Sequence, residues 1–408
     1  MILHLFKLIW NRRRANTLIF TELLAAYLVL ATLGCAAAFY LYNFRQPIGI
    51  VSEGVWVAGI HHGISRREGT PPDKLAEAMA DTKRVLETVR DLPQVQAVAT
   101  AVTGPYVSGM HNTSRLSGDE IPPSGQGLLF DIDHVSDDFD RVFGLTVTSG
   151  RWFGRQDDGA NYLPIVLNEK MAHDFFGNAD PLGQHIGRGD HDLPLRVVGV
   201  VAGYRQKGEL APPLRYMFRR YVPGHPDELP YHKLFVKTRP RTGADFEEIL
   251  EKRLDATINP TWSTSVSYLP EVRTGVRKVE LIPLVAAAIL AGFLMLMVVL
   301  GLTGVLWQNV TQRTREIGLR RAKGATRPFI YAQILGELLV MTSLAIGVGA
   351  TLLAHVPFLN LVEDMNATIY ILGGGSAALV LLVLTVLCGY TPARLAARVE
   401  PALALRTE

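Results

Sequence analysis

The sequence predicts an α+β membrane protein with four transmembrane helices and a large two-lobed α/β extracytoplasmic domain between the first and second spans. Two observations predict this class. Of 408 residues, 48% are hydrophobic and 19% are charged, so membrane spans must share the chain with a domain that has its own core. Long apolar runs occur near the start and in the last third of the chain, and each reaches the ~20 residues that a helix needs to cross a bilayer.

The apolar runs define the expected membrane segments. The first is longer than the apolar core of a signal peptide, so we expect an uncleaved anchor. Before it, residues 1–16 mix bulky apolar side chains with Lys7 and three arginines, which predicts an amphipathic helix at the cytoplasmic interface. After the last run, residues 390–408 form a basic cytoplasmic tail. The four expected spans are residues 17–42, 281–307, 329–356 and 369–389.

Charge next to these spans predicts their orientation. Arginines precede the first span, fill residues 311–327 and follow the last span, whereas the connection 357–368 holds Glu363 and Asp364 and no Lys or Arg. Short cationic loops remain in the cytoplasm. We therefore expect both termini in the cytoplasm, residues 43–280 in the periplasm, and a multi-pass protein of the inner membrane.

Residues 43–280 contain two similar strand–helix–strand passages. Two such passages can pair into a split βαβ sheet with both helices on one face, so residues 43–103 and 233–280 predict one lobe. The domain has no cysteine, and its core must therefore suffice without a disulfide. The expected elements are strand 54–60, helix 72–90 and strand 95–103, then strand 233–238, helix 244–257 and strand 262–268.

The insertion between these passages, residues 104–232, predicts a second lobe. Strand 165–167 is followed by an expected helix over 168–176. Asn168 suits the N-cap of that helix, and Gly177 suits its C-terminal end.

Residues 311–327, TQRTREIGLRRAKGATR, form a short basic segment between the second and third spans. Glu316 and Arg320 are four residues apart and can pair on one helix face. Ile317 offers apolar contact, and Gly324 can end the helix. Charge alone is typical of a topogenic loop that lies against anionic lipid.

The order R-E-I-G-L-R-R-A-K-G-A within this segment resembles the signature loop of MacB/FtsX-type ABC transporter permeases. Lys323 departs from the family pattern, which more often has an apolar residue there. Two further blocks carry the resemblance: the C-terminal PARLAARVEPALALRTE, and a series like that of the MacB-type periplasmic domain, formed by residues 135–153, 168–176, 181–186 and 197–201.

The resemblance implies a MacB-like periplasmic domain over 43–280 and an FtsX-like permease domain over 281–408. It implies that loop 311–327 docks on a separate ABC ATPase subunit, which moves the periplasmic lobes and drives export of lipophilic, peptide, lipoprotein or drug-like cargo. It also implies a dimer with a second permease copy or paralogue, and a periplasmic adaptor and outer-membrane channel as further partners. The coupling residues implied in this way are Arg313, Arg315, Glu316, Ile317, Gly318, Arg320, Arg321 and Gly324.

Catalytic motifs are absent from the sequence. It has no GxxxxGK[ST] phosphate loop, HExxH, GxSxG or CxxC, so we expect a non-catalytic subunit without cofactor or metal, with ATP and Mg bound by the partner ATPase. A net charge of +3 gives no reason to expect a nucleic-acid partner. Two alternatives stay open: an FtsX-like transmitter that activates a periplasmic cell-wall hydrolase, and a membrane sensory receptor.

Two acids, Glu22 and Glu337, lie inside the expected spans near their cytoplasmic ends. Charge in hydrocarbon is costly and usually has a function. Because both are close to the basic loop, we expect structural pairing with its arginines rather than a proton or substrate pathway.

Overall fold

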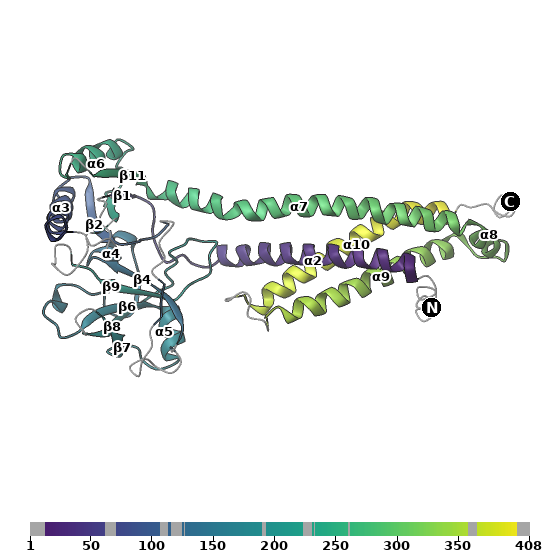
Figure 1. Cartoon of the computed structure of the whole chain (residues 1–408), viewed down its shortest axis with the longest axis horizontal. Helices are drawn as coiled ribbons and strands as arrows, with labels where there is room; N and C mark the ends of the chain where they lie inside the picture. Colours follow the sequence, from purple (N-terminus) through teal and green to yellow (C-terminus); the bar gives the residue numbers. More distant parts are fainter. Residues whose placement is uncertain are drawn as a thin grey trace. The chain divides into compact units, whose positions relative to one another are not determined.

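The chain divides into two compact units (Figure 1). One is Asn43–Glu280, and the other combines Met1–Tyr42 with Leu281–Glu408. The expected interfacial helix 1–16 lies mostly outside the described residues, as do residues 398–408 of the tail. The computed structural model describes residues 13–61, 71–106, 113–115, 125, 127–189, 193–222, 231, 233–259, 262–357 and 365–397.

Four helices are long and apolar enough to cross a membrane, in agreement with the predicted spans. The one large difference is the second of them, which begins well before the predicted residue 281, so that its first turns belong to the unit Asn43–Glu280. The helices are α2 (Arg13–Phe44), α7 (Leu269–Gln312), α9 (Arg327–His355) and α10 (Ala367–Ala397).

Small residues let these helices pack closely. A Cβ on Gly373 of α10 would lie 2.4 Å from the backbone nitrogen of Cys35, and one on Gly34 would lie 2.8 Å from the Gly373 carbonyl oxygen. The contact between α2 and α10 therefore needs glycine on both helices. By contrast, α7 exposes large apolar side chains such as Ile289 and Phe293.

The unit Asn43–Glu280 contains the predicted split βαβ lobe. In the sheet order β11-β1-β10-β2, every neighbouring pair is antiparallel, so β10 lies between β1 and β2 and β1 lies between β10 and β11. Each strand–helix–strand passage is thus split by a strand of the other. The elements are β1 (Val55–His61), α3 (Pro72–Arg90), β2 (Val95–Ala101), β10 (Lys233–Thr238), α6 (Phe246–Asp255) and β11 (Ser263–Tyr268).

Helices α3 and α6 cover one face of this lobe, and their apolar residues share one core with the strands (Figure 1). Trp56 of β1 belongs to this core, and its ring centroid lies 5.8 Å from that of Phe246 on α6. The alternation along β1 sends Val57 to the opposite face, where it meets a second core with Phe139 and Phe235.

The inserted lobe continues the same sheet. Ala101 of β2 pairs with Val135 of β4, after which the order runs β4-β9-β6-β8-β5. In α5 the Asn168 side chain accepts from the Met171 backbone nitrogen at 3.0 Å, and Gly177 follows the helix with φ of 60°. The further elements are β3 (Thr113–Arg115), β4 (Leu129–Val135), α4 (Phe139–Phe143), β5 (Val147–Gly150), η2 (Arg155–Asp157), β6 (Leu163–Asn168), α5 (Glu169–Phe176), β7 (His185–Arg188), β8 (Pro194–Val201) and β9 (Tyr216–Arg220).

A fully buried carboxyl group, Asp133 of β4, holds the turn that follows β2. It accepts hydrogen bonds from the backbone nitrogens of Thr103 and Gly104 at 3.0 and 2.7 Å, and from the Tyr216 hydroxyl at 3.4 Å. Burial disfavours the charged form and raises the pKa of Asp133 to about 6, although these hydrogen bonds partly offset the shift.

We expect the isolated domain Asn43–Glu280 to fold as a soluble protein. Its free energy of unfolding should depend on the protonation of Asp133. Because the folded-state pKa, about 6, lies above the ordinary 3.8, this group stabilises the fold fully below pH 3.8. That contribution is lost as pH rises through about 6. The difference of about two units between the folded and the ordinary pKa corresponds to about 3 kcal/mol in the free energy of unfolding. Urea unfolding of the wild type and Asp133→Asn between pH 4 and 7 measures it. The stability difference between the two should shrink with rising pH, and a constant difference would contradict the assignment.

Candidate functional site

The basic segment between the second and third spans folds into a short helix, α8 (Thr314–Ala322). The Thr314 hydroxyl donates to the carbonyls of Val310 and Thr311 at 3.2 and 2.8 Å, where α7 stops. At the other end Gly324 has φ of 99°, a backbone conformation that favours glycine. Local sequence therefore sets both ends of α8.

The inner face of α8 is apolar and buried. Ile317 packs with Ile330 of α9 and Ala396 of α10, and Gly318 is buried beside it. Both were expected to contact a soluble partner. They face the helical unit instead, because Ile317 fills the apolar gap between α9 and α10.

Polar side chains tie α8 to α9. The Arg313 guanidinium donates to the Glu337 carboxylate at 2.8 Å. Arg320 contacts Glu316 at 2.6 Å and also donates to the Gln333 amide oxygen at 2.8 Å, while Gln333 donates to Glu337 at 3.3 Å. The exposed pair Glu316–Arg320 contributes little by itself. The continuous network, in contrast, fixes α8 to the first turns of α9.

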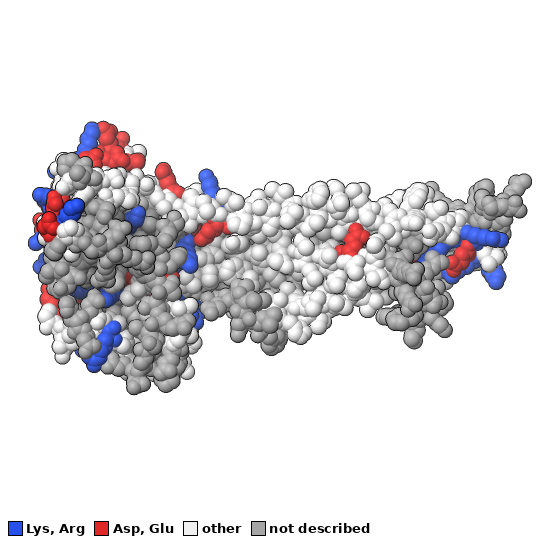
Figure 2. Space-filling model, viewed as in Figure 1, with Lys and Arg blue, Asp and Glu red and all other residues white. Residues whose placement is uncertain are grey.

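The outer face of α8 is the part available to a partner. Arg315, Glu316, Leu319 and Lys323 are exposed, with 49% of the surface of Leu319 accessible. Figure 2 shows the helical unit almost free of charge along its length, with basic side chains gathered at one end beside an acidic group. A cationic surface with one large apolar side chain suits an acidic protein groove.

The two acids of the spans have different surroundings. Glu337 pairs with Arg313, as expected from its place near the loop. Glu22 does not pair with the loop arginines among the described residues; its carboxylate lies against α7, where a Cβ on Gly301 would be 2.3 Å from the Glu22 oxygen. The expected pairing therefore describes Glu337 and is wrong for Glu22.

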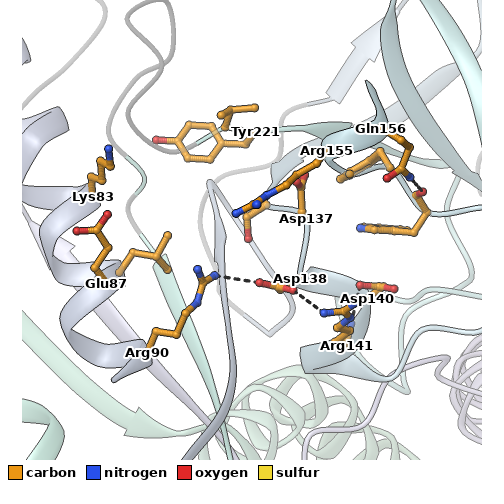
Figure 3. A pocket seen from close by; sticks show the side chains of 16 residues that line it. Lys83, Glu87, Arg90, Asp137, Asp138, Asp140, Arg141, Arg155, Gln156 and Tyr221 are labelled. Atoms are coloured by element: carbon orange, nitrogen blue, oxygen red, sulfur yellow. Dashed lines mark hydrogen bonds and ion pairs between the residues drawn. The ribbon is translucent and has the colours of Figure 1, made fainter. Parts of the chain in front are cut away.

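The unit Asn43–Glu280 has a polar cleft of about 720 Å³ between the split βαβ lobe and the inserted lobe. One wall is the α3 face with Lys83, Glu87 and Arg90, and the other is formed by the segments that lead into α4 and η2 (Figure 3). Buried Trp152 and Phe153 contribute apolar surface to the lining.

An ion-pair chain crosses this cleft. Arg90 contacts Asp138 at 2.9 Å, and Asp138 also contacts Arg141 at 3.3 Å (Figure 3). Asp137 is held by Arg220 at 2.7 Å. The lining residues include no histidine or cysteine, and no group of three metal-binding side chains occurs among the described residues. The cleft is thus a bridged gap between lobes, without a catalytic constellation.

Sequence reasoning missed this cleft. Arg90 and Asp138 come from different lobes and are 48 residues apart, so no local pattern connects them. The clue available was Asp137-Asp138 directly before a helix, which is also an ordinary helix start.

Two family models match the chain. A MacB-like periplasmic core domain matches residues 39–252, and the C-terminal part of an FtsX-like permease matches residues 288–401. Together they cover both units of the structure.

Proteins of several bacteria are similar to this chain. The uncharacterized ABC transporter permease YknZ of Bacillus subtilis is 28% identical over 68% of this chain and 70% of its own length. The macrolide export ATP-binding/permease protein MacB 2 of Aeromonas hydrophila is 26% identical over 82% of this chain, which spans only 50% of that protein. Among solved structures, the periplasmic region of MacB from Actinobacillus actinomycetemcomitans is 16% identical, with a TM-score of 0.37, and the match covers 57% of this chain and 97% of that one.

The chain thus spans about half the length of the MacB proteins that it matches, whose names include an ATP-binding part, and 70% of the length of YknZ. The MacB-like model alone covers more than half of the chain, and its match lies largely within the sheet unit Asn43–Glu280. The FtsX-like match covers most of the last three apolar helices. This chain belongs to the family of ABC transporter permeases that combine a MacB-like periplasmic core domain with an FtsX-like permease domain.

Proposed function

We propose that this permease transmits ATP-driven movement from a separate ABC ATPase subunit, which binds ATP and Mg, to its own periplasmic domain. That movement expels a lipophilic, peptide, lipoprotein or drug-like cargo on the periplasmic side. The permease itself catalyses no reaction. One observation carries the proposal: α8 presents Arg315 and Leu319 to solvent, while its inner face is fixed to α9 and α10.

A fixed helix of this kind can act as a lever. The contact of Ile317 with α9 and α10 and the Arg313–Glu337 pair both resist sliding of α8 over its neighbours. A force applied to the outer face by a partner would therefore displace α9 and α10 with α8. A topogenic loop that only lies on lipid needs no such attachment.

The remaining assignments follow from the family and from charge. Short basic segments favour a cytoplasmic position for α8 and both termini, which would put Asn43–Glu280 in the periplasm and the helices in the inner membrane. The exposed apolar side chains of α7 suit a second permease copy or paralogue beside it. An adaptor and an outer-membrane channel would complete an export path. Since the MacB-like model matches 39–252, cargo export is favoured over activation of a cell-wall hydrolase and over a sensory receptor.

We expect Arg315→Glu combined with Leu319→Asp to weaken binding of the ATPase at least about tenfold, because charge complementarity and an apolar contact are both lost. Glu316 and Arg320 are less suitable positions, since Arg320 also holds Gln333. Binding and permease-dependent ATP hydrolysis are measured with the full-length chain in nanodiscs.

The matched control for that variant is Arg394→Glu, on α10 outside α8, where the guanidinium lies 6.0 Å from the Tyr390 ring centre. The control should bind the ATPase like the wild type. Equal losses in both variants would indicate a general need for basic charge, and normal binding by the α8 variant would restore the topogenic interpretation of the loop.

Topology is tested by single cysteines at Ala244 and Thr326, both exposed, in a chain with Cys35→Ala and Cys388→Ala. We expect a membrane-impermeant maleimide to label position 244 in intact spheroplasts. Position 326 should react only after the membrane is opened. Labelling of both positions in intact spheroplasts would refute the proposed orientation.

A further inference from the structure

The loop of residues 203–213 between β8 and β9, hereafter the junction loop, buries an unusual set of polar side chains. Arg205, Gln206 and Glu209 are each less than 8% exposed. Such residues are seldom buried unless they are paired, because taking a charge out of water is costly. The partners of Arg205 and Glu209 lie in the two segments that enter the membrane helices.

Arg205 holds the end of α2. One terminal nitrogen donates to the carbonyls of Asn43 and Gln46 at 2.7 and 3.1 Å, and the other donates to those of Glu209, at 2.6 Å, and Ala211. At the end of α2, the Asn43 carbonyl also accepts from the Gln46 backbone nitrogen at 3.0 Å, so Arg205 is its second donor. A buried guanidinium at this negative end of the helix dipole also balances the charge. The Asn43 amide also donates to the Leu210 carbonyl at 3.2 Å.

The backbone after α2 is pressed against the same loop. A Cβ on Gly49 would lie 2.0 Å from the Gly203 carbonyl oxygen, and Gly49 has φ of 74°. The Arg205 backbone nitrogen donates to the Ile48 carbonyl at 3.2 Å. The chain between α2 and β1 therefore follows the junction loop closely and has no room for a side chain at Gly49.

Glu209 holds the beginning of α7. Its carboxylate contacts Arg273 at 2.8 Å, with Arg277 one turn further on at 3.8 Å. Arg273 also donates to the Ser52 hydroxyl at 3.3 Å. All these residues belong to the unit Asn43–Glu280.

We propose that Arg205 and Glu209 are the positioning residues through which displacement of α2 and α7 reaches the periplasmic sheet. The inference rests on the proposed function, which requires movement of these helices. The two residues are four positions apart, and Arg205 binds the Glu209 carbonyl, so one short loop joins the end of α2 to the start of α7. That loop continues directly into β8 and β9 of the inserted lobe.

The geometry gives a specific mechanical expectation. If α2 and α7 shift relative to each other, the junction loop must move with both or release one. Release from α7 breaks the ion pairs of Glu209 with Arg273 and Arg277, whose arginines are partly exposed. Release from α2 takes the Arg205 donor from the Asn43 and Gln46 carbonyls and leaves a buried guanidinium with fewer acceptors. Glu209→Gln is therefore the milder change, since the Glu209 backbone carbonyl still binds Arg205.

The experiment is hydrogen–deuterium exchange of the full-length permease with its ATPase in nanodiscs, with and without ATP and vanadate. In the wild type, ATP should change exchange in α8 and in Asn43–Glu280. In Glu209→Gln and in Arg273→Gln, the change in α8 should persist, and the change in Asn43–Glu280 should fall at least twofold. The double variant should lose no more than either single variant, since both act through one contact.

Asp174→Asn is the matched control, because it removes a part-buried pair with Arg215 at 2.7 Å, just after the junction loop, and leaves the contacts of Arg205 and Glu209 in place. It should respond like the wild type. A wild-type response of Asn43–Glu280 in both Glu209→Gln and Arg273→Gln overturns the proposal. A wild type whose α8 responds while Asn43–Glu280 stays silent overturns the proposed function itself, and the two failures are thus distinguishable. If Glu209→Gln loses protection of the β6 and β10 strands without ATP, Arg273→Gln decides, as its side chain is 33% exposed.

Discussion

The absence of water in the bilayer is the constraint on which the rest of this structure depends. Backbone groups in hydrocarbon must bond within their own segment, so the apolar parts of the chain can only be helices there. Charged side chains are consequently driven to the ends of the spans. The α8 network lies at one such end, and the junction loop binds the residues where α2 ends and α7 begins. In both places an arginine donates hydrogen bonds to groups of another segment.

The two ends solve this problem differently. At α8 the groups are half-buried, and the network of Arg313, Gln333 and Glu337 joins side chain to side chain. At the junction loop the guanidinium of Arg205 is buried, and within the described part of the chain its hydrogen bonds go to backbone carbonyls. Although burial lowers the pKa of Arg205, an arginine remains charged at any physiological pH. A side-chain network can exchange partners at a modest cost in free energy. Separating a buried guanidinium from its carbonyl acceptors costs more, so we expect the junction loop to be the stiffer of the two.

Local features of the fold could be predicted from the sequence, and long-range features could not. The bounds of α3 follow from its apolar period with Pro at its start, and those of α5 from Asn168 and Gly177. The pairing of Ala101 with Val135, in contrast, depends on where an insertion rejoins a sheet, which leaves no local pattern. The contact of Arg205 with Asn43 spans 162 residues and is equally invisible.

At the candidate site, α8, local features could again be predicted and long-range ones could not. Its position, charge and C-terminal glycine could be predicted because each depends on neighbouring residues. The direction in which Ile317 points could not, because a helix of nine residues with basic side chains on several faces has no clear polar side. Only the gap between α9 and α10, formed by distant parts of the chain, determines which face turns inward.

The position of β10 between β1 and β2 also fixes an order of events during folding. β1, α3 and β2 are synthesised first, yet they cannot complete their sheet until residues 233–238 arrive. The inserted lobe has its own core around Phe175 and Ile165 and is complete in sequence before β10. The inserted lobe can therefore assemble while β1 and β2 still lack the strand that lies between them. A chaperone that shields strand edges would have its target in β1 and β2 during this interval.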